Sequence, residues 1–387
     1  MQKHIGDFDI AIIGAGIAGA SLAAEIAGLS RVVVLERESQ PGYHTTGRSA
    51  AIYSPIYGPQ PIRALTRASL GFLMSPPGGF AEHSLLKPRN ATFIAREDQL
   101  SKLEAMQDEL SDSSTITRID ALEVERRVGL LREGYAKSAL WDNGTSEIDV
   151  ASLHQGYLRQ FKTRGGTMMM SSDVKRVTRD GDIWTIETSK GCLAADKIVN
   201  AAGAWAEEVG KMAGAEIIGL VPKRRTALMI DPPDGVVVDQ LPLIVDVNEE
   251  FYLKPDAGKL LISPANEDPE PPCDVQPDEM DIAICVDRIE RAFDISVRRV
   301  QNSWAGLRSF VADKVPVVGY SDIVEDFYWL AGQGGYGVQS APAIAQYAAA
   351  DIMGQPVPEH ILSERLNPDN LSPGRLGIGA WSCSHLY

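Results

Sequence analysis

Residues 9–36 read DIAIIGAGIAGASLAAEIAGLSRVVVLE, and this stretch decides the fold. Its first apolar run, Ile10–Ile13, is short and does not alternate with polar residues, as expected of a strand buried on both faces of a parallel sheet. The small apolar residues at 17–27 fit a helix packed tightly on that sheet, and residues 31–36 form a second strand-like run. A strand, a helix and a strand in this order predict a right-handed crossover with the two strands side by side.

The turn between the first strand and the helix carries the pattern Gly14-x-Gly16-x-x-Gly19. In a Rossmann-type unit the first glycine makes the tight turn, the second lets the backbone approach a pyrophosphate, and the third lets the helix pack on the strand. Glu36 lies 22 residues after Gly14, where a carboxylate accepts hydrogen bonds from ribose hydroxyls and repels a 2′-phosphate. The unit therefore predicts FAD or NAD rather than NADP, with the phosphates at the helix N-terminus.

Composition excludes several other classes of protein. The 387 residues are 44% apolar and 23% charged, which fits a globular chain of two domains. A net charge of −15, with Lys223–Arg225 as the densest basic run, argues against nucleic acid, which is bound through clustered lysine and arginine. The four cysteines lack metal-ligand or disulfide spacing, so we expect no metal and a reducing compartment. The apolar run at 10–24 is too short to span a bilayer, so we expect a cytoplasmic protein without membrane insertion.

The rest of the chain predicts a second sheet of a different kind. Short strand-like runs occur at 225–230, 243–247, 251–254 and 259–263, and the turn Pro255–Gly258 marks a hairpin. Residues 196–200 and 327–331 look like further buried strands of the first domain. The last helix is expected over 340–353, with Pro342 in its first turn.

Three further segments carry a resemblance to a known family. They are residues 42–51 (GYHTTGRSAA), 200–205 (NAAGAW) and 332–337 (GQGGYG). Together with the glycine motif, these segments resemble the D-amino-acid oxidase/glycine oxidase superfamily of FAD-dependent oxidoreductases over about residues 9–373. Within it the chain is most similar to bacterial FAD-dependent D-arginine dehydrogenases, through residues 33–38 (VVLERE), 251–258 (FYLKPDAG) and 304–313 (WAGLRSFVAD).

The resemblance implies FAD as the cofactor. It implies non-covalent attachment, because the cysteine of covalently flavinylated members is absent from 307–310. Residues 332–337 would place N–H groups and a helix dipole near the flavin region that becomes anionic as hydride arrives. The implied FAD-binding residues are Gly14, Gly16, Gly19, Glu36, Arg37, Thr46, Arg48, Ser49, Ala50, Ala202, Gly203, Gly332, Gly334, Tyr336 and Gly337.

The predicted fold class is α/β. We expect a discontinuous Rossmann-type FAD-binding domain with a parallel sheet at 1–85, 145–220 and 305–372. A substrate-binding domain, built on a mixed or antiparallel sheet with helices, is expected at 86–144 and 221–304, and a flexible tail at 373–387.

Flavin oxidation of an amino acid depends mainly on positioning the substrate. By resemblance, Arg225 and Arg308 would grip the substrate carboxylate, for which bidentate arginine geometry is well suited. Arg308 also lies in an apolar string, where a guanidinium needs a ligand or an internal carboxylate. Tyr252 would contact the same carboxylate, and Gly335 would offer its carbonyl to the amine. Tyr57, in a loop with two prolines and a glycine, would form a lid that shields the flavin from water.

Departures from the arginine-specific relatives set the expected substrate. Ala91 stands where those relatives have a glutamate that pairs with the cationic side chain, Ile52 replaces a histidine and Ser54 replaces a threonine. A cationic side chain would then be desolvated without a partner. We therefore predict oxidative deamination of a D-amino acid with a neutral or apolar side chain. Candidates for replacing the missing charge are Glu82, Glu249 and Glu250.

Two alternative substrates and two acceptors stay open. An N-substituted glycine such as sarcosine or iminodiacetate would use the same fold and carboxylate clamp, and D-arginine or D-lysine itself is the second alternative. The electron acceptor is quinone-like or O2.

Overall fold

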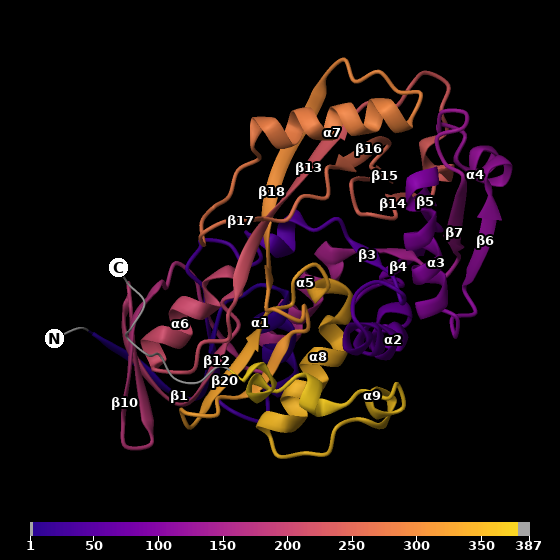
Figure 1. The fold of residues 1–387 in the computed structure, drawn as a ribbon. Helices are drawn as coiled ribbons and strands as arrows, with labels where there is room; N and C mark the ends of the chain where they lie inside the picture. Colours follow the sequence, from indigo (N-terminus) through magenta and orange to yellow (C-terminus); the bar gives the residue numbers. More distant parts are fainter. Residues whose placement is uncertain (1–2, 378–387) are drawn as a thin grey trace.

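The computed structural model describes residues 3–377 and contains two large sheets, joined by the long strands β13 and β18 (Figure 1). In the first sheet the strand order is β10-β11-β12-β1-β2-β9, and β20 pairs with β12 and β19. β1 runs parallel to both β2 and β12. The parallel β1–β2 pair is the one predicted from the strand–helix–strand pattern of residues 9–36. The strands of this sheet are β1 His4–Ile13, β2 Val32–Leu35, β9 Thr167–Met169, β10 Val174–Asp180, β11 Ile183–Thr188, β12 Gly191–Asn200, β19 Val317–Tyr320 and β20 Phe327–Ala331.

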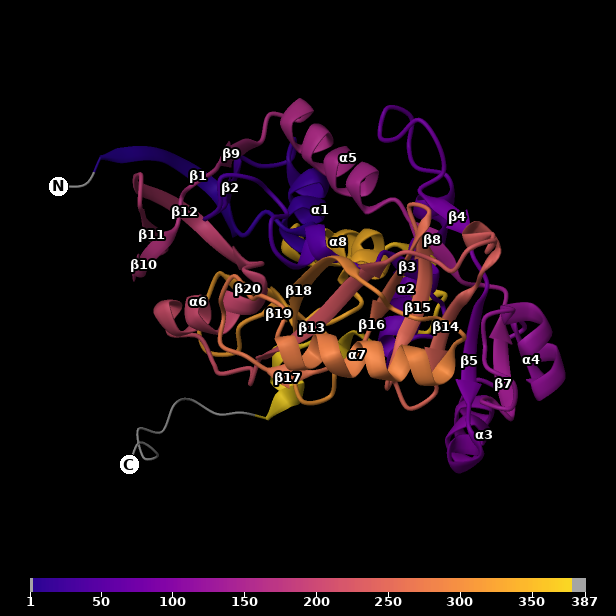
Figure 2. The same ribbon diagram turned by 90° about the horizontal axis from the view of Figure 1, so that it is seen from above.

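Both faces of this sheet are buried. Alternate residues of β1 enter two cores, with Ile10 and Ile12 on one side and Ala11 and Ile13 on the other. Helices α1, α5 and α8 cover the first side, and α6 covers the second (Figure 2). The helices are α1 Ile17–Ile26, α2 Gln60–Met74, α3 Leu100–Glu109, α4 Ala121–Val128, α5 Val150–Thr163, α6 Ala206–Ala213, α7 Glu279–Ala292, α8 Gly337–Ile352 and α9 Glu359–Leu362.

The second sheet is mainly antiparallel. Its strand order is β17-β13-β16-β15-β14-β5-β7-β6, β18 pairs with β13, and the β14–β5 pair is parallel. Helix α7 packs on one face over a core that includes Leu228, Ile262 and Phe293. This arrangement confirms the predicted α/β fold. The strands are β5 Ala91–Ala95, β6 Ile116–Asp120, β7 Ser138–Asp142, β13 Val221–Ile230, β14 Leu243–Asp246, β15 Tyr252–Asp256, β16 Lys259–Ser263, β17 Asp268–Pro269 and β18 Val300–Phe310.

A small third sheet connects the two large ones. It has the order β3-β8-β4, with β3 Ile52–Tyr53, β4 Leu86–Pro88 and β8 Ser146–Ile148. It brings Ile52, from the segment that follows the glycine unit, beside the substrate-side sheet. None of the helices found within residues 3–377 is long and apolar enough to cross a bilayer.

Several predicted boundaries were wrong. β13 begins at Val221 rather than at 225, because it pairs with β18 along its whole length. Helix α8 begins at Gly337 rather than at 340, so Pro342 lies inside the helix and beyond its first turn. The residues 373–376, predicted to belong to a flexible tail, form a 3-10 turn, and Arg375 pairs with Asp313 at 2.9 Å. Residues 378–387 of the predicted tail lie outside the described residues.

Candidate active site

Two of the motif glycines are required by their surroundings. Gly14 has φ +105°, and a Cβ there would lie 2.4 Å from the carbonyl oxygen of Ala201. A Cβ on Gly19 would lie 2.0 Å from the carbonyl oxygen of Gly14, so this glycine lets α1 pack on the turn below it. These contacts match the predicted roles of the first and third glycines.

The N-terminus of α1 is open to a ligand. Gly16, its N-cap, makes no side-chain capping bond, and the first turn carries no acidic residue. The N–H of Ile17 donates to Thr46 Oγ1 at 2.9 Å, which fixes the following loop against the helix. Gly16 and Thr46 both line a cavity, here called the dinucleotide cavity, that opens at the ends of β1 and β2. Free N–H groups and the positive end of a helix dipole suit phosphate groups.

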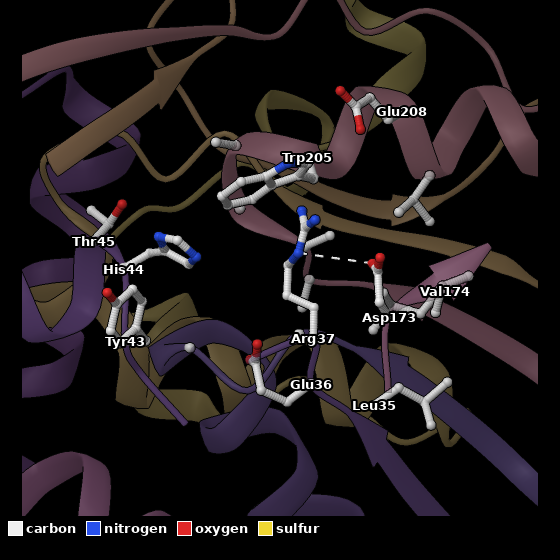
Figure 3. Close-up of a pocket in the computed structure, with 18 of the residues that line it drawn as sticks. Leu35, Glu36, Arg37, Tyr43, His44, Thr45, Asp173, Val174, Trp205 and Glu208 are labelled. Carbon is white, nitrogen blue, oxygen red and sulfur yellow. Dashed lines mark ion pairs between the residues drawn. The ribbon is translucent and has the colours of Figure 1, made fainter. Parts of the chain in front are cut away.

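The far end of the dinucleotide cavity is polar (Figure 3). Glu36 is buried at the end of β2, and its carboxylate accepts from the N–H groups of Ala15 (2.8 Å) and Glu38 (2.9 Å). Arg37 lies over the Trp205 ring at 4.6 Å and pairs with Asp173 at 3.8 Å. A fixed carboxylate beside an aromatic and a guanidinium fits the sugar and base end of a dinucleotide, as the sequence predicts for Glu36 and Arg37.

A second cavity, here called the flavin cavity, continues from the first. Helix α8 points its N-terminus toward it, and the N-cap residue Tyr336 makes no side-chain capping bond. Ser309 lines the flavin cavity, and its buried hydroxyl has no hydrogen-bond partner in the described part of the chain. A Cβ on Gly334 would lie 2.1 Å from the Phe310 ring, so the loop before α8 needs glycine there. The predicted cofactor residues that line this cavity are Gly16, Thr46, Arg48, Ser49, Ala50, Gly203, Gly332, Gly334 and Gly337.

The two connected cavities fit FAD. They share Gly16, Thr46, Arg48 and Gly203, and they run from the carboxylate of Glu36 to the N-terminus of α8. The predicted residue Ala202 lines the dinucleotide cavity. Two open helix N-termini and an unpaired buried hydroxyl are what a polar, phosphate-bearing ligand needs. Among residues 3–377 no cluster of side chains suited to a metal ion occurs.

Two predicted cofactor residues have other contacts. The Arg48 guanidinium donates to the carbonyls of Val275 (3.1 Å) and Ala305 (2.9 Å) and pairs with Asp274. Arg48 therefore also ties the loop to the second sheet. Tyr336 lines an outer cavity, here called the vestibule, together with Tyr57 and Glu249. The rings of Tyr336 and Tyr57 meet edge-on there, with their centroids 5.1 Å apart.

The two predicted clamp arginines lie together. In the β13–β18 ladder Lys223 pairs with Arg308 and Arg225 pairs with Gly306, so the two arginines are diagonal neighbours on one face. Both line the flavin cavity and also a third one, here called the substrate cavity. Because Gly306 has no side chain, the space opposite Arg225 stays open. The sheet register therefore brings both guanidinium groups to the junction of the two cavities.

The two arginines differ in how the protein holds them. Arg225 is 7% exposed, and it donates to the Asn266 carbonyl at 2.8 Å and to Glu267 Oε1 at 3.3 Å. Within residues 3–377, the guanidinium of Arg308 has no hydrogen bond and no ion pair. A Cβ on Gly335 would lie 2.8 Å from Arg308 Nη1, so glycine leaves room for this side chain. Arg308 is thus a cation without an internal partner at the wall of a cavity.

Electrostatics favour an anion between the arginines. Burial lowers the pKa of Arg225, and the neighbouring charge of Arg308 lowers it further. Burial also lowers the pKa of Arg308, but electrostatic interactions with Tyr57, Tyr252 and Glu249 outweigh this effect of burial. The pKa of Arg308 is therefore raised overall. Both guanidinium groups stay charged at neutral pH, because an arginine starts far above that range. Two adjacent cations at a cavity wall are stabilised by a bound carboxylate.

The two tyrosines predicted for the site border the same space. Tyr252 lines both the flavin and substrate cavities. Tyr57 lines the substrate cavity and the vestibule beyond it, and burial raises the pKa of its hydroxyl, which stays neutral. The Tyr57 loop packs closely, since a Cβ on Gly58 would lie 2.9 Å from the Tyr336 ring. Tyr57 therefore separates the substrate cavity from the vestibule, which is the place a lid would occupy.

The side-chain end of the substrate cavity is mainly apolar. Ile52 and Ser54 line it, whereas Ala91, which lies beside Leu243 in the β14–β5 ladder, is not among the lining residues. Phe93 and other apolar side chains complete the wall. Of the three candidate glutamates, Glu249 lines the substrate cavity, Glu250 pairs with Arg96 at 3.1 Å, and Glu82 is not among the lining residues.

Sequence reasoning missed three polar residues at this site. Gln339, on α8, accepts from the N–H of Ser54 at 3.0 Å, and its buried amide nitrogen has no partner among residues 3–377. Glu267 holds Arg225 from the loop after β16. Lys254 lies two residues after Tyr252 on the same strand. Strand alternation was the one available signal, because it places Lys254 on the same face as Tyr252.

Comparison with known proteins agrees with this geometry. The sequence profile described as FAD dependent oxidoreductase (DAO) matches residues 9–351. The chain belongs to this FAD-dependent oxidoreductase family. Human mitochondrial dimethylglycine dehydrogenase is 26% identical over 259 residues, which cover 62% of this chain and 30% of that protein. The rat enzyme is 25% identical over 381 residues, which cover 89% and 43%. The chain thus spans less than half the length of these curated relatives.

Solved structures show the same fold. Glycine oxidase from Geobacillus kaustophilus superposes with a TM-score of 0.78 at 20% identity, covering 90% of this chain and 95% of that one. Iminodiacetate oxidase from Chelativorans sp. BNC1 superposes with a TM-score of 0.78 at 21% identity, covering 94% and 98%. FAD is therefore the cofactor that both the family and the cavity geometry support.

Proposed function

We propose that this enzyme oxidises a D-amino acid to its imino acid, which hydrolyses to the 2-oxo acid, with FAD held non-covalently. The observation that carries the proposal is the pair Arg225 and Arg308, which meet at the junction of the flavin and substrate cavities. When bound, FAD supplies the two-electron acceptor that takes the Cα hydride at N5. The protein's part is to hold the amino acid so that its Cα–H faces that acceptor.

The clamp residues have distinct tasks in this proposal. Arg308 is free to give a bidentate contact to the substrate carboxylate, and Arg225 adds a second cation already oriented by Asn266 and Glu267. Tyr252 donates its hydroxyl to the same carboxylate. The amine must be neutral when hydride leaves, so it enters with its proton already lost to solvent, and Tyr57 then keeps water out of the cavity.

We propose that neutral and apolar side chains are preferred to cationic ones. Support comes from the apolar wall of Ile52, Phe93 and Leu243. Glu249, the carboxylate that lines the substrate cavity, is solvent-exposed. A buried ammonium or guanidinium would lose its hydration here without gaining a counterion.

A second candidate is oxidation of an N-substituted glycine. The names of the matched dimethylglycine dehydrogenases and of the superposed iminodiacetate oxidase favour it. The same carboxylate clamp would serve, with a secondary or tertiary amine replacing the primary one.

Anaerobic mixing of the purified yellow holoenzyme with single amino acids tests the proposal. We expect flavin absorbance to bleach with D-methionine or D-alanine, more slowly with D-arginine, and not with the L forms. Bleaching by sarcosine alone would favour the second candidate, and bleaching by D-arginine alone would overturn the proposed side-chain preference. Reoxidation on admitting air, compared with reoxidation by a soluble quinone, then identifies the electron acceptor.

A further inference from the structure

Lys254 is a buried cation on the wall of the substrate cavity. It is 3% exposed, and its closest ionic partner is Asp256, whose Oδ2 lies 3.8 Å from Nζ. Asp256 is itself 42% exposed and solvated. In the described part of the chain the ammonium has no hydrogen-bond acceptor. A buried ammonium is costly unless it is paired and hydrogen-bonded, so this group calls for an anionic ligand.

The sheet register places Lys254 at the side-chain end of the cavity. Strand alternation puts Lys254 on the face of Tyr252, roughly 7 Å farther along β15. In the β14–β15 ladder Leu253 pairs with Ile244 and Tyr252 with Val245, so the register brings Lys254 opposite Leu243. Leu243 in turn pairs with Ala91. The cavity that begins at the clamp arginines therefore reaches Lys254.

Among the charged side chains that line the substrate cavity, the cations outnumber the carboxylates. The lining residues include three cations, Arg225, Arg308 and Lys254, and one carboxylate, Glu249, at the mouth. Glu267 already contacts Arg225, and the substrate's α-carboxylate serves Arg308. Lys254 then has only the solvated carboxylate of Asp256, 3.8 Å away, as a counterion.

Two further hydrogen-bond donors at this cavity also lack acceptors. The hydroxyl of Ser54 and the amide nitrogen of Gln339 are buried and have no partner within residues 3–377. Unpaired buried donors are rare in native proteins, and these two lie on side chains that line the same cavity as Lys254.

We propose that Lys254 binds a second carboxylate of the substrate, so that the preferred substrate is an aminodicarboxylate. The inference rests on the proposed function and refines it. Cationic side chains stay excluded, neutral ones bind through the apolar wall, and an acidic end gains an ion pair. Two sources share this chemistry: a primary amine, such as D-glutamate or D-aspartate, and a secondary amine, iminodiacetate.

Ligand binding tests the inference without turnover. The holoenzyme is titrated with glutarate and, separately, with butyrate, and the shift of the flavin absorption bands reports binding. We expect glutarate to bind at least about tenfold more tightly than butyrate, and Lys254→Met to remove that advantage while leaving butyrate binding unchanged. Lys259→Met is the matched control, because Lys259 lies on the same hairpin but pairs with Asp231 outside the cavity. Equal binding of both acids by the unmodified enzyme would overturn the inference.

Turnover separates the two substrate sources and the two proposals. The ratio of kcat/KM for D-glutamate to kcat/KM for D-glutamine is expected to fall about tenfold or more in Lys254→Met. In Lys254→Arg, which keeps the positive charge, this ratio is expected to stay close to that of the unmodified enzyme. Faster bleaching by iminodiacetate than by D-glutamate would identify the secondary amine. Glutarate binding that depends on Lys254, without bleaching by any D-amino acid, would refute the proposed oxidation alone. An unchanged ratio in Lys254→Met, with unchanged FAD content, would refute the role of Lys254 alone.

Discussion

Replacement of Arg308 by methionine is expected to abolish most substrate recognition while leaving the fold intact. The guanidinium of Arg308 makes no hydrogen bond or ion pair within residues 3–377, so its loss breaks neither and removes the repulsion that helps to lower the pKa of Arg225. Truncating one partner of a buried, hydrogen-bonded charge pair costs about 2–5 kcal/mol. The expected fall in kcat/KM is therefore roughly 30- to 4,000-fold.

Arg225→Met is the informative comparison. It removes the donors to the Asn266 carbonyl and to Glu267, so it is expected to lower the unfolding temperature as well as kcat/KM. Arg308→Lys keeps the charge but loses the bidentate geometry and is expected to fall between wild type and Arg308→Met. The assays are steady-state kinetics with the substrate found by anaerobic bleaching, FAD content and thermal unfolding. A fall in kcat/KM below about threefold in Arg308→Met, or destabilisation as large as that of Arg225→Met, would refute the reasoning.

Three further predictions concern the cofactor turn, the side-chain pocket and acid stability. Gly14→Ala is expected to yield protein without bound FAD, because the added Cβ would lie 2.4 Å from the carbonyl oxygen of Ala201. The flavin absorbance of the purified protein measures the FAD content, and a normal content would contradict this prediction. Ile52→Glu is expected to raise kcat/KM for D-arginine relative to D-methionine by about tenfold, because Ile52 lines the substrate cavity, with Ile52→Gln as the uncharged control. Burial lowers the pKa of His154 from 6.5, so the unfolded chain binds this proton more readily and the free energy of unfolding falls as the pH drops through that value. Urea titrations across that range should show a weaker pH dependence in His154→Gln, and an unchanged slope would remove His154 as the cause.

Local signals explain what was predictable from sequence. The turn from Gly14 to Gly19 was recognisable from its glycine spacing, and the structure shows two of the reasons: Gly14 has φ +105°, and a Cβ on Gly19 would lie 2.0 Å from the Gly14 carbonyl oxygen. Arg308 stood out because a guanidinium in an apolar string needs a partner outside the strand. The diagonal placement of Arg225 and Arg308 follows from the β13–β18 register, which only the family resemblance had suggested.

Long-range contacts explain what was not predictable. Gln339 meets Ser54 across 285 positions of sequence, and no local pattern indicates such a pair. Lys254 reads in sequence as one lysine in a strand, and its burial depends on neighbouring strands β14 and β16. The start of α8 was placed too late because Gly337 is a weak helix former, whereas tertiary packing of the helix overrides that propensity.

A crystal structure of the holoenzyme with a bound, unreactive carboxylate tests the central claim most directly. The account predicts FAD along the two connected cavities and one carboxylate within hydrogen-bond distance of both Arg225 and Arg308. An arginine directed away from that carboxylate, or a flavin ring bound elsewhere, would contradict it.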